Sequence, residues 1–387
     1  MKKLGICICY QHRNYGSQLQ SYATTVELRN RNIDYEIIRY KKKFTPALLI
    51  KSLPRLFNPV FINDRFKVRY QKKIMLQIHP ELKNANDERN RCLAEFSKER
   101  FTRLSPVYYG YDELCNKAGN KYDGVMVGSD QLWNPGGITS NFYNLMFAGE
   151  SLTKFSYSAS FGVSRVEEKY HELYKTFLSR LDYISVRENS GKELVKQLSG
   201  REAEVVVDPV LLLNGDEWLK EIPNEKIYDE PYIFAYFLGK STDYRRAVTD
   251  FARKKGLKIV TEHHMDSYNK ADVDFGDYAP FNVGPAEFVN LIRNAEYVFT
   301  DSFHGSVFST LYKKKFLVFN RYSDSDIASK NSRIDSFCAN YALNDRRYDG
   351  NINRVDDEIN YDEVLSRVEK HRKASKQFLD KALKDFS

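Results

Sequence analysis

Apolar residues along this chain gather in short runs that are separated by longer amphipathic or polar stretches. Each run has the length of one β-strand, and most of the stretches between them have helical composition. Runs that are apolar throughout are typical of parallel strands buried on both faces. In the first half the predicted strands are LGICICY at 4–10, DYEIIRY at 34–40, YDGVMVG at 122–128, KFSYSAS at 154–160, DYISVRE at 182–188 and AEVVVDP at 203–209.

A charged tract that is closed by proline, NGDEWLKEIPNEKIYDEP at 214–231, interrupts this pattern. The alternation then restarts with the strand-like runs YIFAYFL, LKIVTEH, EYVFT and KFLVFN, and with helical stretches between them. We therefore predict an α/β protein of two Rossmann-like doubly wound parallel-sheet domains. The expected N-terminal domain spans 1–215, a linker spans 216–231 and the C-terminal domain spans 232–345.

The tail, residues 346–387, predicts a long helix with apolar positions along a charged surface. These positions are Val364, Val368, Phe378, Leu379 and Leu383. Such a helix is long enough to cross back over both domains.

The net charge of +8 is concentrated in one segment, since residues 39–73 hold eleven Lys or Arg and a single acid, Asp64. Apolar residues lie among these cations. This basic insertion, at about 41–75, indicates either peripheral contact with an anionic membrane surface or acceptor, or a solvated helical excursion. No nucleic-acid-binding motif accompanies the charge, so we do not expect nucleic acid as a partner.

No apolar run approaches the roughly eighteen residues needed to span a bilayer. The N-terminal run turns polar without a signal-peptide cleavage site. We expect a cytoplasmic protein, at most peripheral at the inner face of the membrane. The five cysteines form no paired metal motif, and His263 and His264 lack a third ligand nearby, so the sequence predicts no metal site.

The segment TDSFHGSVFST at 300–310 begins where a predicted strand ends and a helix starts. In parallel sheets, ligands bind at this edge, where helix N-termini carry unpaired N–H groups. Gly305 would let an anion approach the backbone, Ser302 and Ser306 would add hydroxyl donors, and His304 would supply an acid or base. The alternative is structural: Asp301 or Ser302 caps the helix while His304 packs.

The loop NYGS at 14–17 holds the corresponding place in the first domain. Asn14, Tyr15 and Gly16 are candidate substrate-binding residues there, although the G-x-G-x-x-G fingerprint is absent. A helix entry without a ligand is the alternative.

The loop VGSDQLWNPGG at 127–137 crowds polar and aromatic groups onto a strand end. Ser129, Gln131 and Trp133 could hold hydroxyls and stack on a sugar ring, and Asp130 could act as a general base. Alternatively, Asp130 bonds its own backbone in a polar turn.

Four cations are further candidates for an anion site. Arg187 lies at another strand end, where it either binds an anion or pairs with Glu188 or Asp182. Arg321, Lys330 and Arg333 follow the strand FLVFN and could close around a phosphate, or could be ordinary surface cations.

Several of these stretches, taken in order, resemble the polysaccharide pyruvyl transferase family. They are NYGSQLQSY from 14, VGSDQLWNP from 127, SYSASFG at 156–162, ISVRE at 184–188, VDPVL at 207–211 and FHG at 303–305. The resemblance implies two Rossmann-like domains facing across a cleft, as in GT-B glycosyltransferases. The N-terminal domain would take the acceptor and the C-terminal domain the donor.

The resemblance also implies an activity in bacterial capsule or exopolysaccharide synthesis: transfer of pyruvate from phosphoenolpyruvate onto two hydroxyls of a sugar, free or lipid-linked, as a cyclic ketal. No cofactor is implied. His304 matches the family histidine that binds the donor and acts in acid–base catalysis, with Asp130 a candidate base. Arg187 and the cations after the second-domain strands would hold carboxylate and phosphate.

The sequence departs from the family pattern at one position, since members often carry arginine where this chain has Ser302. Serine cannot replace a planar charged fork, so Arg321 or Arg333 would have to compensate, or the donor differs. Two alternative functions follow. One is a GT-B glycosyltransferase that uses a nucleotide sugar, and the other is a non-catalytic, membrane-associated scaffold in polysaccharide assembly.

Overall fold

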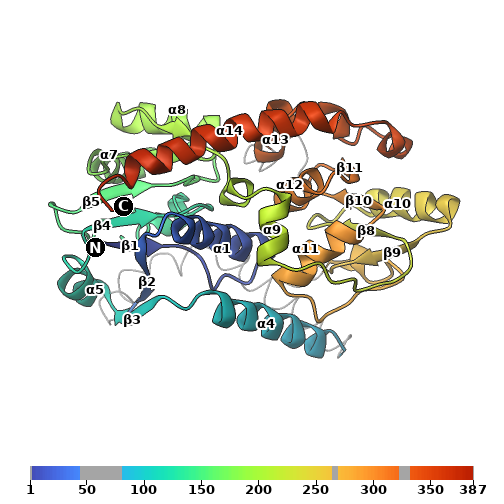
Figure 1. Ribbon diagram of the computed structural model, residues 1–387, viewed down its shortest axis with the longest axis horizontal. Helices are drawn as coiled ribbons and strands as arrows, with labels where there is room; N and C mark the ends of the chain where they lie inside the picture. Colours follow the sequence, from blue (N-terminus) through green and yellow to red (C-terminus); the bar gives the residue numbers. More distant parts are fainter. Residues whose placement is uncertain (1, 44–80, 264–268, 322–331, 387) are drawn as a thin grey trace.

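Figure 1 shows the computed structural model of the chain, which describes residues 2–43, 81–263, 269–321 and 332–386. Most of the basic segment at 39–73, together with His264 and Lys330, lies outside the described residues. Predictions that concern those positions therefore stay predictions.

The first half of the chain builds a parallel sheet with the strand order β3-β2-β1-β4-β5. Single bridges from Phe155 to Tyr183 and from Ala159 to Val186 continue it towards the short parallel pair of β6 and β7. The strands are β1 Lys3–Cys7, β2 Asp34–Lys41, β3 Leu104–Tyr109, β4 Gly124–Val127, β5 Thr153–Ser156, β6 Ser185–Val186 and β7 Glu204–Val205. All six predicted strands are present, and β3 is an addition that the sequence pattern did not reveal.

Helices connect these strands. They are α1 Tyr15–Asn30, α4 Glu81–Arg100, α5 Tyr111–Ala118, α6 Pro135–Ile138, α7 His171–Ser179 and α8 Asn189–Ser199. Helix α1 is buried at every position from Tyr15 to Leu28. A helix buried all round has neighbours on every side, and in Figure 1 α1 lies in the middle of the molecule, between the first sheet and helix α11 (Pro285–Asn294) of the second half.

The second half repeats the architecture with a four-stranded parallel sheet in the order β11-β10-β8-β9. Its strands are β8 Tyr232–Tyr236, β9 Lys258–Thr261, β10 Tyr297–Thr300 and β11 Lys315–Val318. Besides α11, its helices are α10 Thr242–Lys255, α12 Phe303–Leu311 and α13 Ser332–Asn340. The predicted class, two parallel-sheet α/β units, is confirmed.

The start of the tract predicted as a polar linker, 216–231, is structured. Helix α9 (Gly215–Glu221) begins at a capping box on Asn214. Its Trp218 is fully buried, and the indole Nε1 donates a hydrogen bond of 2.9 Å to the carbonyl of Val210. This first stretch of the predicted linker is therefore held in the core by one buried tryptophan, despite the charged residues around it. The domain boundaries stay a prediction.

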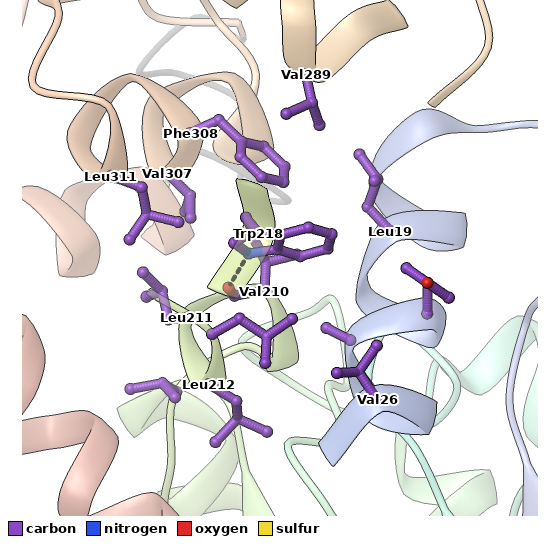
Figure 2. Packing of buried hydrophobic residues seen from close by; sticks show 14 of the residues in the cluster. Leu19, Val26, Val210, Leu211, Leu212, Trp218, Val289, Val307, Phe308 and Leu311 are labelled. Carbon is purple, nitrogen blue, oxygen red and sulfur yellow. Dashed lines mark hydrogen bonds between the residues drawn. The ribbon is translucent and has the colours of Figure 1, made fainter. Parts of the chain in front are cut away.

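Figure 2 shows what Trp218 packs against: side chains from α1, from the 3₁₀ helix Pro209–Leu212, from α11 and from α12. These residues belong to both halves and form one apolar cluster. The halves therefore meet through a continuous core, which fixes the position of α1 against α12.

The last helix, α14 (Tyr361–Ala382), crosses back over both halves (Figure 1). Near its start Tyr361 donates a hydrogen bond to the carbonyl of Lys314, in the second half. Near its end Asp380 pairs with Arg31, in the first half, at 3.0 Å. The crossing predicted for the tail is confirmed. Among the described helices, none combines the length and apolarity needed to span a membrane.

Candidate active site

His304 lies at the beginning of α12, directly beyond the carboxyl end of β10. Ser302 is the N-cap residue of this helix, and its Oγ accepts a hydrogen bond of 3.3 Å from the backbone N–H of Gly305. Asp301 is not the cap, since its carboxylate accepts from the backbone N–H groups of Leu238 and Gly239, both at 2.7 Å. The strand-to-helix turn predicted from TDSFHGSVFST is therefore present.

The imidazole of His304 rests against the first turn of α1, in the other half of the molecule. A Cβ atom on Gly16 would lie only 2.0 Å from Nδ1 of His304, so no other residue fits at position 16 without displacing the ring. Asn14 caps this helix through its Oδ1, which accepts from the N–H of Ser17 at 3.1 Å. Gly16 of the NYGS loop thus leaves space for the imidazole of His304. The sequence alone did not indicate this role.

Asp208 faces the other nitrogen of the histidine. Its Oδ2 lies 3.7 Å from Nε2 of His304, an ion-pair distance rather than a hydrogen bond, and accepts a 2.8 Å hydrogen bond from Nη1 of Arg187. Burial works against ionisation of Asp208, but the neighbouring His304 and Arg187 hold its pKa well below the ordinary range. A buried carboxylate therefore links the histidine to an arginine.

Sequence reasoning noted the VDPVL stretch but gave Asp208 no role. The available signal was an aspartate near the carboxyl end of the predicted strand at 203–209, the edge where His304 and Arg187 were also expected. Of the partners foreseen for Arg187, Glu188 lies 3.7 Å away, whereas the Asp182 carboxylate accepts from the backbone N–H of Lys154.

Asp130 has a left-handed backbone, with φ of 85°, which is unusual for a residue other than glycine. Its carboxylate accepts hydrogen bonds from Oγ of Ser17 at 2.6 Å and from its neighbour's N–H, that of Gln131, at 2.8 Å. Burial opposes ionisation, yet Arg187 and these two donors lower its pKa below the ordinary value. Asp130 is thus an ionised carboxylate at neutral pH.

A cavity of about 170 Å³ joins most of these groups, and we call it the histidine cavity. Seven predicted site residues line it: Asn14, Asp130, Gln131, Ser302, His304, Arg321 and Arg333. The residues that line this cavity follow strands of both sheets, because the carboxyl ends of the two sets of strands face each other across it.

An adjoining cavity of about 250 Å³, the arginine cavity, lies between the start of α8, α13 and α14. Arg187 and Asp208 line it, and Phe303 and Arg333 line both cavities. The guanidinium groups of Arg187 and Arg333 lie 5.5 and 5.9 Å from the ring of Phe303. The ring of Phe303 and these two guanidinium groups form the boundary between the cavities.

The structure corrects several predicted contacts. Trp133 is fully buried against Phe161 and Phe177, so it has no free face for a sugar ring. Ser129 is also fully buried, with its hydroxyl 3.4 Å from that of Ser158. Both follow a strand that is covered on both faces, which draws the loop into the core.

Three more predicted residues have packing roles. The phenol oxygen of Tyr15 lies within hydrogen-bond distance of Glu262, at 3.1 Å, and of the Val283 carbonyl, at 3.2 Å, so it joins the halves. A Cβ on Gly305 would lie 2.7 Å from Oγ1 of Thr300, so the glycine permits close helix packing rather than approach of an anion. The hydroxyl of Ser306 donates within the helix, to the carbonyl of Ser302 at 3.0 Å.

We compared the chain with known protein families to find which of them it belongs to. The sequence model of the polysaccharide pyruvyl transferase family matches residues 14–323, which is most of the chain and includes ten of the thirteen residues that line the histidine cavity. The chain belongs to the polysaccharide pyruvyl transferase family. Membership confirms the resemblance seen in the sequence and indicates a transferase of polysaccharide biosynthesis. A search of curated proteins finds no match.

Solved structures similar to this pyruvyl transferase family member share its fold at low sequence identity. A Staphylococcus aureus MnaA structure with UDP has a TM-score of 0.51 and 12% identity, over 99% of this chain and 96% of the other. The UDP-N-acetylglucosamine 2-epimerase of Rickettsia bellii has a TM-score of 0.50 and 10% identity, over 100% and 97%. The likeness confirms a GT-B-like fold and no more than the fold.

Proposed function

We propose that this chain transfers pyruvate from phosphoenolpyruvate onto two hydroxyls of a sugar, in a surface polysaccharide or its lipid-linked precursor, to form a cyclic ketal. The observation that carries the proposal is the position of His304. This side chain lies at a helix N-terminus, is held between Gly16 and the ionised Asp208, and lines a cavity with Arg321 and Arg333.

The histidine cavity suits a small donor with two anionic groups. Besides the two arginines, the first turn of α12 offers backbone N–H groups that have no acceptor within the helix, and a helix N-terminus carries partial positive charge. Arg321 and Arg333 thus supply, from other elements, the positive charge that the family arginine would bring at position 302. Ser302 itself is occupied as the helix cap.

The proposed reaction starts with proton transfer from the imidazolium of His304 to C3 of the donor, which leaves C2 electrophilic. A sugar hydroxyl forms a bond to C2 and loses its proton, the C2–O bond to phosphate breaks, and the second hydroxyl closes the ketal with loss of its own proton. One hydroxyl proton restores the histidine and the other leaves with inorganic phosphate. The balance is donor plus diol to ketal plus phosphate.

Asp208 and Asp130 have separate tasks in this scheme. The Asp208 carboxylate attracts the protonated imidazole and fixes the direction of Nε2, so it acts as a positioning residue. Asp130 is the candidate base that accepts a hydroxyl proton. It is already in the ionised form that this role requires, although its lowered pKa makes it a weak base.

The test is release of inorganic phosphate from phosphoenolpyruvate in the presence of polysaccharide fragments from which pyruvate has been removed by acid. The proposal predicts phosphate release equal to pyruvate incorporated, and a loss of about 10²-fold or more in His304→Ala. Turnover of His304→Ala within a few-fold of wild type would exclude the histidine as the acid.

A further inference from the structure

The arginine cavity has features of an anion site that the donor chemistry above does not use. It is the larger of the two cavities and shares only Phe303 and Arg333 with the histidine cavity. Its lining residues come from the start of α8, from α13, from α14 and from the segment at 205–211.

The first feature is the beginning of α8, an eleven-residue helix that opens at this cavity. Its N-cap residue, Glu188, makes no side-chain hydrogen bond to the helix, and its Oε1 instead accepts from Ser160 at 2.6 Å. The first amides of a helix have no acceptor within the helix, so in the absence of a cap they are available to an oxyanion.

The second feature is independent of the helix and concerns Arg187, whose side chain is 3% exposed. Only Nη1 is hydrogen-bonded, to Asp208; Nε lies 3.7 Å from Oε2 of Glu188, an ion-pair distance, and Nη2 is buried without a hydrogen-bond acceptor among the described residues. Buried arginine N–H groups are almost always paired, so the Nη2 donor indicates a partner that arrives from outside.

The third feature is the second cation on the same wall. Burial and the nearby Arg187 lower the pKa of Arg333 to about 10, against the attraction of the Asp130, Glu188 and Asp208 carboxylates, so both guanidinium groups are charged at neutral pH. Each also packs on Phe303. An oxyanion beside them would complete the hydrogen bonds of Arg187.

The remaining lining suits a sugar rather than a bare ion. Asn189 and Asn340 are exposed at the cavity and offer amide groups for hydroxyls, with Ser336 beside them on α13. We propose that the arginine cavity binds the acceptor through an oxyanion, a phosphate or a carboxylate carried on the sugar. This inference rests on the proposed function, and it assigns the larger cavity to the larger substrate.

The test is calorimetric titration of glucose 1-phosphate, glucuronate, glucose and inorganic phosphate into the full chain saturated with phosphoenolpyruvate. We expect the two anionic sugars or one of them to bind, with inorganic phosphate weaker and glucose weakest. Which anionic sugar binds identifies a phosphate or a carboxylate. Absence of binding by all four probes would overturn the proposal.

Two variants locate the site. Ser336→Trp fills the cavity, and Asn340→Trp narrows its entrance from an exposed position that tolerates a large side chain. Each tryptophan should keep the anionic sugar from its full set of contacts and weaken its binding about tenfold or more, an effect as large as the loss of one charged hydrogen bond. The affinity for phosphoenolpyruvate should stay within about twofold of wild type. Ala339→Trp, on the exposed side of the same helix, is the matched control.

The outcomes separate the two proposals. Loss of phosphoenolpyruvate binding in Asn340→Trp would overturn the acceptor assignment and give this cavity to the donor. If the chain binds the anionic sugar in a tryptophan-sensitive way but never binds phosphoenolpyruvate, the site assignment stands and the proposed donor is wrong.

Discussion

Replacing Asp208 by asparagine tests the link between the histidine and the arginine. The change keeps the shape of the side chain and removes its charge. Asp208 is fully buried, and the Arg187 side chain that it pairs with is 3% exposed, so water cannot compensate for the lost partner. The variant leaves a buried guanidinium facing a neutral amide.

The size of the effect follows from this geometry. Charges 2.8 Å apart, the separation of Arg187 Nη1 and Asp208 Oδ2, attract each other by about 6 kcal/mol at an effective dielectric constant of about 20. Part of this only offsets the desolvation of both groups. Removing one partner of a buried pair typically costs about 3–5 kcal/mol of unfolding free energy, and we expect a loss in that range.

The loss should depend on pH in a definite direction. The folded-state pKa of Asp208 lies below its usual value of about 3.9, so its contribution to stability is complete above about pH 5 and is lost as the pH falls through the folded-state pKa. Urea unfolding at pH 7 should therefore separate wild type from Asp208→Asn widely. At pH 3 the difference should be smaller, because the carboxyl is then largely protonated in the unfolded chain, and it should vanish only when the pH falls below the folded-state pKa.

Glu202→Gln is the control, because that carboxylate pairs with Lys196 at the surface. Its unfolding curve should stay close to wild type at every pH. A difference of less than 1 kcal/mol between wild type and Asp208→Asn at pH 7, or an equal difference at pH 3, would refute the buried-pair interpretation. The same variant should lower turnover and alter its pH profile, since His304 loses the charge that orients it.

Three other predictions follow from the site and the contact between the halves. Gly16→Ala should displace the His304 ring and reduce turnover about 100-fold in a phosphate-release assay, whereas Gly137→Ala, where a Cβ has no neighbour within 4 Å, should not. Glu262→Gln should remove a loss of stability that wild type accumulates as the pH rises from about 4.5 to about 8 and that levels off above it, because burial raises the folded-state pKa of Glu262 to about 8, and thermal melts from pH 5 to 9 measure this. Arg333→Gln should raise the KM for phosphoenolpyruvate about tenfold with a smaller change in kcat; equal falls in kcat and kcat/KM would contradict a donor-binding role.

Much of the fold could be predicted because each strand is a compact apolar run. DYEIIRY became β2, and YIFAYFL became β8. Strand β3 was missed since its side chains alternate between buried and exposed and follow a charged helix. Helix α9 was missed because a single residue, Trp218, holds it in the core.

The candidate site was predicted in part for a related reason. The sequence pattern indicates which residues follow a strand. It therefore allowed His304, Asp130, Arg321 and Arg333 to be assigned to the carboxyl edges of the sheets, where they line one cavity. Contacts between the halves could not be inferred, so the fit of His304 against Gly16 had no local signal, and the position of Asp208 near a strand end did not reveal that it faces both His304 and Arg187. Burial was the other unknown, and it removed Trp133 and Ser129 from the site.

The identity of the donor is the central claim, and direct binding tests it without knowledge of the acceptor. Calorimetric titration of phosphoenolpyruvate should be compared with UDP- and GDP-sugars, for wild type and for His304→Ala. The account predicts saturable binding of phosphoenolpyruvate alone, weakened in the variant. Binding of a nucleotide sugar in place of phosphoenolpyruvate would contradict it and would show that Ser302 marks a change of donor.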